Sequence, residues 1–157
     1  PLMEGTIREN ILYGCEKEVT EEELMRVIKL AKADEFISEL PDGLDTKIAC
    51  GATNLSGGQK QCLAIARAMV QDAKLLLLDE ATSSLGCKRE HMVMDALQEL
   101  MKGRTTIIIA HSLTTIQNAD HVIVMHNGMI EEQDSFENIM KKPGNYLSKL
   151  ACRCRTN

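Results

Sequence analysis

Leu55-Ser56-Gly57-Gly58-Gln59 begins a helical pattern that continues to about Val70. Ser56 is suited to cap this helix, because its hydroxyl can accept a hydrogen bond from a free amide of the first turn while Gln59 reaches back to the Ser56 amide. The two glycines leave the remaining first-turn amides bare. Bare amides at the positive end of a helix dipole attract anions, so the stretch predicts a phosphate site. A well-capped structural helix is the alternative interpretation.

Two apolar runs follow, Leu75 to Leu78 and Thr105 to Ala110, and neither alternates with polar residues. Such runs are typical of strands buried on both faces of a parallel sheet. Because the segment from Glu90 to Lys102 between them has helical spacing, the pattern predicts a right-handed parallel crossover. The predicted fold class is therefore α/β.

Reactive groups stand directly after both predicted strands: Asp79 and Glu80 after the first, and His111 after the second. Open α/β sheets bind ligands at the carboxyl ends of their strands. Two carboxylates and an imidazole at one sheet edge suit a metal ion, a general base and a phosphate contact. The sequence predicts a catalytic site at this edge.

The first seventy residues are predicted to be helical. Thr6 is expected to cap a short helix that Gly14 stops, and Thr20 with Glu23 has the spacing of a capping box. A further short turn of helix is expected from Asp34. These elements predict a helical part over residues 1–70 and a strand-containing part over 71–157.

The carboxyl-terminal part begins with a predicted hairpin. Residues 121–126 and 129–132 flank Asn127-Gly128, a strong signal for a two-residue turn. Ser135 is expected to cap a helix to about Met140, and a last helix is expected after Pro143-Gly144.

Composition narrows the function classes. The net charge of −5, with two Phe, two Tyr and no Trp, argues against nucleic-acid binding. Six cysteines without C-x-x-C spacing fit a reduced cytosolic setting. No apolar run is long enough to cross a bilayer, so a membrane role is expected to come through a partner.

The chain begins at Pro1 and is expected to be a fragment of a longer protein. His91, His121 and His126 have no partners at ligand spacing and are interpreted as surface or structural residues.

Taken together, these motifs resemble the ATP-binding cassette domain of ABC transporters, most closely the cassettes of bacterial multidrug exporters of the half-transporter kind. Residues 55–59 match the signature motif, 75–80 the Walker B strand, 83–86 the D-loop and His111 the switch histidine, while residues 5–11 match the start of the helical subdomain. The resemblance covers the whole chain. It implies an incomplete P-loop NTPase (RecA-like) parallel sheet with an α-helical signature subdomain.

The resemblance also implies roles for individual residues. Asp79 would hold Mg²⁺ through water, Glu80 would act as general base on the attacking water, and His111 would contact the γ-phosphate of ATP. The signature residues would bind that phosphate on the opposite cassette of a pair, and the D-loop would link the two sites; these residues are Ser56, Gly57, Gly58 and Gln59, with Ser84, Leu85 and Gly86 in the D-loop. The implied partners are a second cassette, identical or different, and the membrane domains of an exporter, with the cassette on the cytoplasmic side.

Several positions depart from the family pattern. The sequence has no G-x-x-x-x-G-K-[ST] loop, so the isolated chain is expected to bind ATP weakly and to be inactive. The D-loop ends in Gly86 where Asp is usual, residues 49–52 replace the G-E-R-G common in exporters, and Cys62 and Ser112 stand where Arg is usual.

Three functions are therefore considered. The first is the ATP-binding part of an exporter that hydrolyses ATP, and the second is a non-hydrolysing partner that supplies only its signature face to another cassette. The third, a DNA-repair or chromosome-maintenance ATPase, fits poorly because residues 5–40 read as a helical subdomain instead of a coiled-coil insertion.

Overall fold

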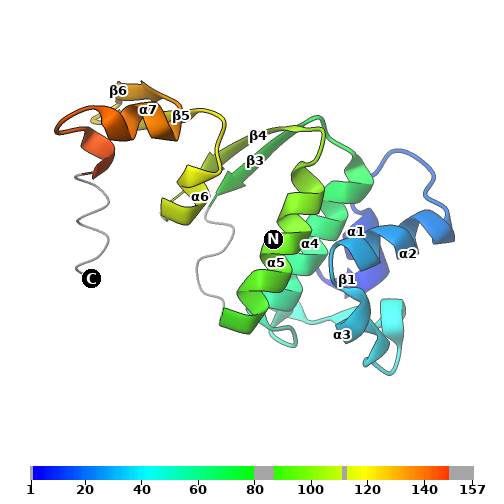
Figure 1. The fold of residues 1–157 in the computed structure, drawn as a ribbon. Coiled ribbons are helices and arrows are strands. Elements are labelled where there is room, and N and C mark those ends of the chain that lie inside the picture. Colours follow the sequence, from blue (N-terminus) through cyan, green and yellow to red (C-terminus); the bar gives the residue numbers. More distant parts are fainter. Residues whose placement is uncertain (1, 80–86, 111–112, 149–157) are drawn as a thin grey trace. The chain divides into compact units, whose positions relative to one another are not determined.

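The computed structural model describes residues 2–79, 87–110 and 113–148, which form two compact units, 1–107 and 108–157 (Figure 1). The elements are β1 Gly5–Thr6, α1 Ile7–Leu12, α2 Glu21–Leu30, α3 Asp34–Ser38, the 3-10 turn η1 Gly43–Asp45, β2 Lys47–Ile48, the 3-10 turn η2 Cys50–Ala52, α4 Gly57–Gln71, β3 Leu75–Asp79, α5 Cys87–Met101, β4 Thr105–Ile109, α6 Leu113–Gln117, β5 Val122–His126, β6 Met129–Asp134 and α7 Phe136–Lys141. The predicted α/β fold class is confirmed. The predicted boundary near residue 70 stays a prediction.

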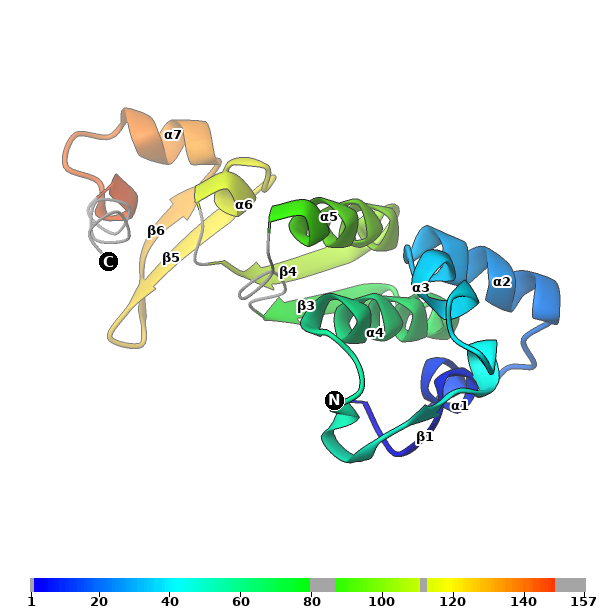
Figure 2. The same cartoon turned by 90° about the horizontal axis from the view of Figure 1, so that it is seen from below.

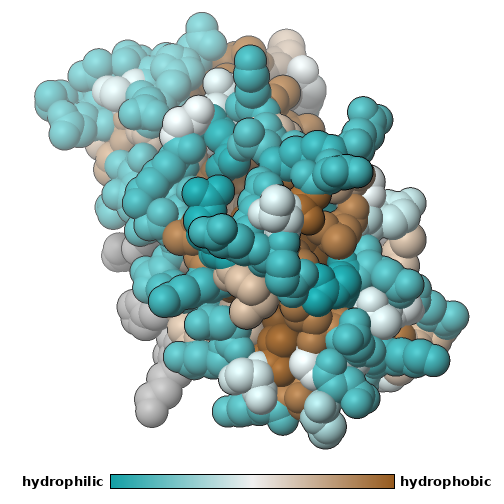
Figure 3. Space-filling view, turned by 90° about the vertical axis from the view of Figure 1, so that its right-hand side faces the viewer, coloured by the Kyte–Doolittle hydropathy of each residue, from teal (hydrophilic) through white to brown (hydrophobic). Residues whose placement is uncertain are grey.

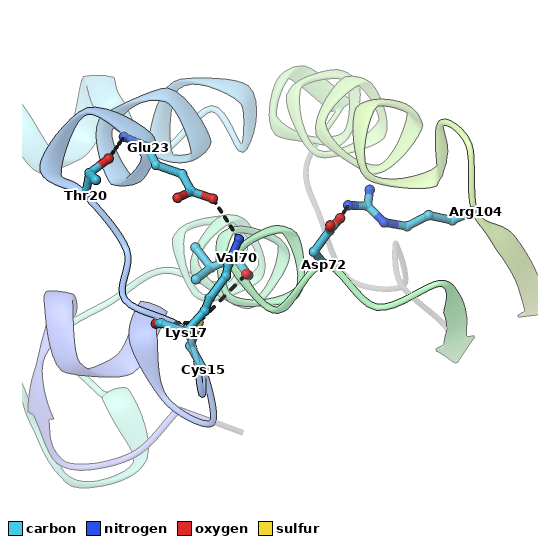
Figure 4. Close-up of polar contacts among 7 residues, drawn as sticks. All are labelled: Cys15, Lys17, Thr20, Glu23, Val70, Asp72 and Arg104. Atoms are coloured by element: carbon cyan, nitrogen blue, oxygen red, sulfur yellow. Dashed lines mark hydrogen bonds and ion pairs between the residues drawn. The ribbon is translucent and has the colours of Figure 1, made fainter.

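The helices α1, α2 and α3 begin as the sequence predicts. Thr6 caps α1, and here the Glu9 side chain completes a capping box that was not predicted. Thr20 caps α2 by accepting from the Glu23 amide, but the predicted capping box is only half formed. The Glu23 carboxylate accepts from Lys17 Nζ at 2.8 Å (Figure 4), because a lysine in the preceding loop competes with the backbone amide for it.

These helices and α4 share one core. Fully buried side chains from α1, α2 and α4 meet there, including Ile7, Ile11, Leu24, Ile28 and Leu63. Ile37 of α3 is also buried, and Phe36 and Leu40 pack partly buried against this core. Helix α3 therefore packs its apolar side against the same core.

Helices α4 and α5 lie side by side along the two-stranded sheet of β3 and β4 (Figure 2). The Thr105 amide, at the start of β4, donates to the Lys74 carbonyl just before β3 at 3.0 Å, so the two strands start together. Both arrows in Figure 2 point the same way, as the predicted parallel crossover requires. The carboxyl ends of β3 and β4 therefore lie at one edge of the sheet.

The prediction that both strands are buried on two faces is wrong for the described structure. Leu76 is only 6% exposed, whereas its neighbours Leu75 and Leu77 are 54% and 73% exposed. In β4, Ile107 and Ile109 are 54% and 55% exposed. The physical reason is that, among the described elements, α4 and α5 pack on one face of this sheet and no helix covers the other. We call Leu75, Leu77 and Ile107 the open sheet face.

The second unit contains the hairpin that the Asn127-Gly128 signal predicts. Asn127 and Gly128 have positive φ angles of 49° and 77°, and His126 pairs with Met129 across a two-residue turn. The register shifts between Val124 and Met125, so the ladder carries a bulge. Its core consists of Val122, Val124, Ile139 and Leu147.

The carboxyl-terminal helices also start where the sequence predicts. Ser135 caps α7 by accepting from the Asn138 amide, and residues 146–148 are helical after Pro143-Gly144.

Within the described ranges, no helix is both long enough and apolar enough to cross a membrane. The face seen in Figure 3 is mostly hydrophilic, with patches of hydrophobic residues between the polar ones.

Candidate functional site

The first turn of α4 has the geometry that its sequence predicts. Ser56, the N-cap, is extended at φ −70° and ψ 160°. Its Oγ accepts from the Gln59 amide at 3.4 Å, and Gln59 Oε1 accepts from the Ser56 amide at 2.8 Å. The capping box is therefore confirmed. The capping box provides acceptors for two amides at this helix end, those of Ser56 and Gln59, and holds the Ser56 side chain over the turn.

The amides of Gly57 and Gly58 are left over by this arrangement. Neither has an acceptor in the described part of the chain, as is usual for the orphan amides at a helix start. Gly57 is exposed and Gly58 is buried. Because α4 has 15 residues, its dipole places a partial positive charge at this turn. The turn thus offers a hydroxyl, two amides and a favourable field to a phosphate group.

A cavity of about 290 Å³ lies beside this turn, between α3, α4 and α5. Phe36 and Met92 line it on two sides, and Cys62 is buried at its wall. Burial raises the pKa of the Cys62 thiol to about 11, so the thiol is neutral. The position where the resembled family usually has a cationic Arg is therefore uncharged here.

Asp79 is the last residue of β3 and its carboxylate is exposed at the carboxyl edge of the sheet. An exposed carboxylate at this place fits a magnesium ion held through water. In the described ranges no group of three or more His, Cys, Asp or Glu side chains is arranged to hold a metal. The other predicted catalytic and D-loop positions lie outside the described residues: Glu80, Ser84, Leu85, Gly86 and His111. Their meeting with Asp79 stays a prediction.

The loop before the signature is held by side-chain hydrogen bonds. The Asn54 side chain bridges it, accepting from the Ala49 amide at 3.0 Å and donating to the Lys47 carbonyl at 3.0 Å. Lys60 of α4 donates to the Gly51 carbonyl at 3.2 Å. The loop is thus tied to the first turns of α4. An Asn one residue before Leu55 was the available signal, since Asn side chains commonly bond nearby backbone.

Sequence reasoning also missed a polar contact between α1 and α4. Arg67 of α4 is half-buried. Its Nε donates to the Asn10 carbonyl at 2.7 Å, its Nη2 donates to Asn10 Oδ1 at 3.0 Å, and its guanidinium lies 5.5 Å from the Tyr13 ring centroid. Burial lowers the pKa of Arg67, and the interaction with Tyr13 opposes this shift. Residues 57 positions apart in sequence give no local signal of such a contact.

Comparison with known proteins places these features in a family. The family model described as ABC transporter matches residues 2–83, which include the signature turn and Asp79. Among curated proteins, "Multidrug resistance protein 1" of Entamoeba histolytica is 50% identical over 147 residues, covering 92% of this chain and 11% of that protein. The "ATP-dependent lipid A-core flippase" of Legionella pneumophila is 48% identical over 145 residues, covering 92% of this chain and 24% of that protein.

A third relative is "ABC transporter B family member 21" of Arabidopsis thaliana, which is 46% identical over 149 residues, covering 95% of this chain and 11% of that protein. The chain thus spans roughly a tenth to a quarter of the length of the curated relatives it matches. A match over more than half of the chain, together with the capped Ser-Gly-Gly-Gln turn, leads to one conclusion: the chain belongs to the ABC transporter family and is part of its ATP-binding domain.

Proposed function

We propose that this chain is part of an ABC exporter in which ATP binding and hydrolysis at a pair of cassettes drive substrate export. In this proposal the first turn of α4 binds the γ-phosphate of an ATP molecule whose remaining phosphates are held by a phosphate loop elsewhere. The single observation that carries the proposal is the turn itself: Ser56 fixed by its capping box, beside the two uncommitted amides of Gly57 and Gly58. The names of the relatives, a multidrug resistance protein and a lipid A-core flippase, support export as the process.

The chemistry at the sheet edge completes the proposal. Asp79 would hold Mg²⁺ through water, Glu80 would take a proton from the attacking water, and His111 would contact the γ-phosphate. Mg²⁺ supplies charge neutralisation for the phosphates when bound. The chain would act on the cytoplasmic side, attached through the membrane domains of the transporter and paired with a second cassette.

The alternative proposal is a non-hydrolysing partner that supplies only the signature face. It is favoured by departures inside the matched motifs, since Gly86 stands where the D-loop usually has Asp and Cys62 stands where Arg is usual. Both proposals require the same contact between the α4 turn and an ATP-loaded cassette. They differ in whether the pair hydrolyses ATP at a site that contains Glu80.

The contact can be tested by mixing the chain with an intact exporter cassette in which the catalytic Glu is replaced by Gln, so that bound ATP persists. We expect an ATP-dependent complex in sedimentation or light scattering, and we expect Ser56→Ala to weaken it by about tenfold or more, as for loss of a hydrogen bond to a charged group. Thr20→Ala is the matched control, because it removes a helix cap of the same kind from α2 at a similar cost in stability. No complex with ATP, or equal weakening by both variants, would contradict the proposal.

Hydrolysis distinguishes the two candidates. If the pair hydrolyses ATP and Glu80→Gln in this chain abolishes part of that activity, the first proposal stands. If the activity of the pair is unaffected by Glu80→Gln, this chain serves only as a binding partner. The isolated chain is expected to bind ATP weakly, and micromolar affinity for a fluorescent ATP analogue would contradict that expectation.

A further inference from the structure

Asn10 is a buried polar residue that connects three parts of the first unit. It is only 3% exposed, although its side chain is an amide. Its Oδ1 accepts from the Met3 amide at 2.8 Å, and its Nδ2 donates to the carbonyls of Met3 at 2.9 Å and Thr6 at 3.0 Å. One side chain therefore holds the segment of residues 2–6 against the first turn of α1.

The same residue also holds α4. Arg67 donates to both the carbonyl and the Oδ1 of Asn10, so the guanidinium and the Met3 amide share one acceptor. A guanidinium with two donors on one residue fixes both distance and orientation, which a single hydrogen bond does not. Asn10 thus hydrogen-bonds both to the segment 2–6 and to helix α4.

Helix α4 carries this link to the phosphate-binding turn. Arg67 and Ser56 lie on the same continuous 15-residue helix, whose one face is buried against α1, α2 and α5. A regular helix packed along its length moves as a rigid body, so a displacement at Arg67 also displaces its first turn. Arg67 lies in the last turns of this helix, and Ser56 caps its first turn.

We propose that Asn10 is a positioning residue that couples the segment 2–6 to the phosphate-binding turn of α4 through Arg67. This inference rests on the proposed function, in which that turn binds the γ-phosphate. A change in the position of residues 2–6 alters the hydrogen bonds of Asn10, shifts Arg67 and with it the orientation of the Ser56 turn. The coupling is reciprocal, so phosphate binding at the turn also restrains residues 2–6.

Two conservative variants distinguish the hydrogen bonds between Asn10 and the segment 2–6 from those between Asn10 and Arg67. Asn10→Asp keeps acceptors for the Met3 amide and for Arg67, but it cannot donate to the carbonyls of Met3 and Thr6. Arg67→Lys keeps the positive charge but reaches at most one of the two Asn10 acceptors. Gln71→Ala is the matched control, because Gln71 Nε2 donates to the Tyr13 carbonyl at 2.9 Å and so links the same two helices without Asn10.

The first measurement is hydrogen exchange of the Met3 amide in the full chain, with circular dichroism to show that each variant is folded. In this link Arg67 donates to Asn10, and Asn10 in turn bonds to Met3, so a purely local clamp of Met3 by Asn10 predicts unchanged exchange in Arg67→Lys. The coupling predicts that exchange at Met3 rises by about tenfold in Arg67→Lys and in Asn10→Asp, but changes less than about twofold in Gln71→Ala. Unchanged exchange in Arg67→Lys would overturn the coupling whatever the function of the turn.

The second measurement is the ATP-dependent complex described above. We expect Asn10→Asp and Arg67→Lys to weaken it by about tenfold, and Gln71→Ala by less than about twofold. If Met3 exchange rises but the complex is unaffected, the link does not position the turn, and the inference is wrong. If the unmodified chain forms no complex, the proposed function fails, while Met3 exchange still decides whether Asn10 couples the two segments.

Discussion

Two adjacent leucines of β3 allow a direct test of the one-sided burial of the sheet. Leu76 is 6% exposed and packs into the core of the first unit, whereas Leu77 is 73% exposed on the open sheet face. The substitutions Leu76→Ala and Leu77→Ala remove the same atoms from the same strand. Both substitutions change strand propensity equally, so the difference between their free energies of unfolding reports the difference in burial.

The expected magnitudes follow from the exposed fractions. Full burial of the three removed carbons contributes about 2.4 kcal/mol, at about 0.8 kcal/mol for each carbon. Leu76→Ala loses nearly all of this and leaves a cavity, so we expect a loss of about 2.5–4 kcal/mol in the free energy of unfolding. Leu77→Ala loses roughly a quarter of the transfer free energy, about 0.6 kcal/mol.

Urea unfolding at low protein concentration provides the measurement. In a Tyr146→Phe background, tyrosine fluorescence reports on Tyr13 and hence on the first unit, because these are the two tyrosines of the chain. The m-value should be the same in both variants. Equal losses of more than about 2 kcal/mol would show that β3 is buried on both faces and would refute the reasoning.

Three further outcomes follow from the structure. The pKa of Glu21 lies below its ordinary value of 4.5 because Arg8 donates a hydrogen bond to the carboxylate. Glu21→Gln should therefore be less stable than the unmodified chain at neutral pH. In acid denaturation this difference in stability should disappear as the pH falls through the lowered pKa. Cys50 is exposed and should react with iodoacetamide in the folded chain. Cys62 is buried and its pKa is raised to about 11, so it should react only after unfolding. Peptide mapping that finds Cys62 modified in the folded chain would contradict this expectation. The open sheet face should cause the isolated chain to self-associate, and Leu77→Lys should reduce the association seen in light scattering; a monodisperse unmodified monomer would argue against it.

Local patterns in the sequence were sufficient to predict the helix starts, the hairpin turn and the family of this protein. A Ser and a Gln three residues apart determine the capping box of α4, and Asn127-Gly128 determines the hairpin turn, because both depend on hydrogen bonds and φ angles within a few residues. The order and spacing of the signature and the apolar strand were enough to identify the family. The positions of the helix starts at Thr6, Thr20 and Ser135 have the same local origin.

Tertiary structure alone decided which of these side chains are buried and which distant groups they meet. An apolar run such as Leu75 to Leu78 reads the same whether one or both faces are covered, and only the packing of α4 and α5 shows that one is. Glu23 had two nearby donors, the Thr20 amide and Lys17 Nζ, and the path of the chain brought Lys17 to it. The link between Asn10 and Arg67 spans 57 residues, so it depends on how α1 docks on α4, which no local pattern specifies.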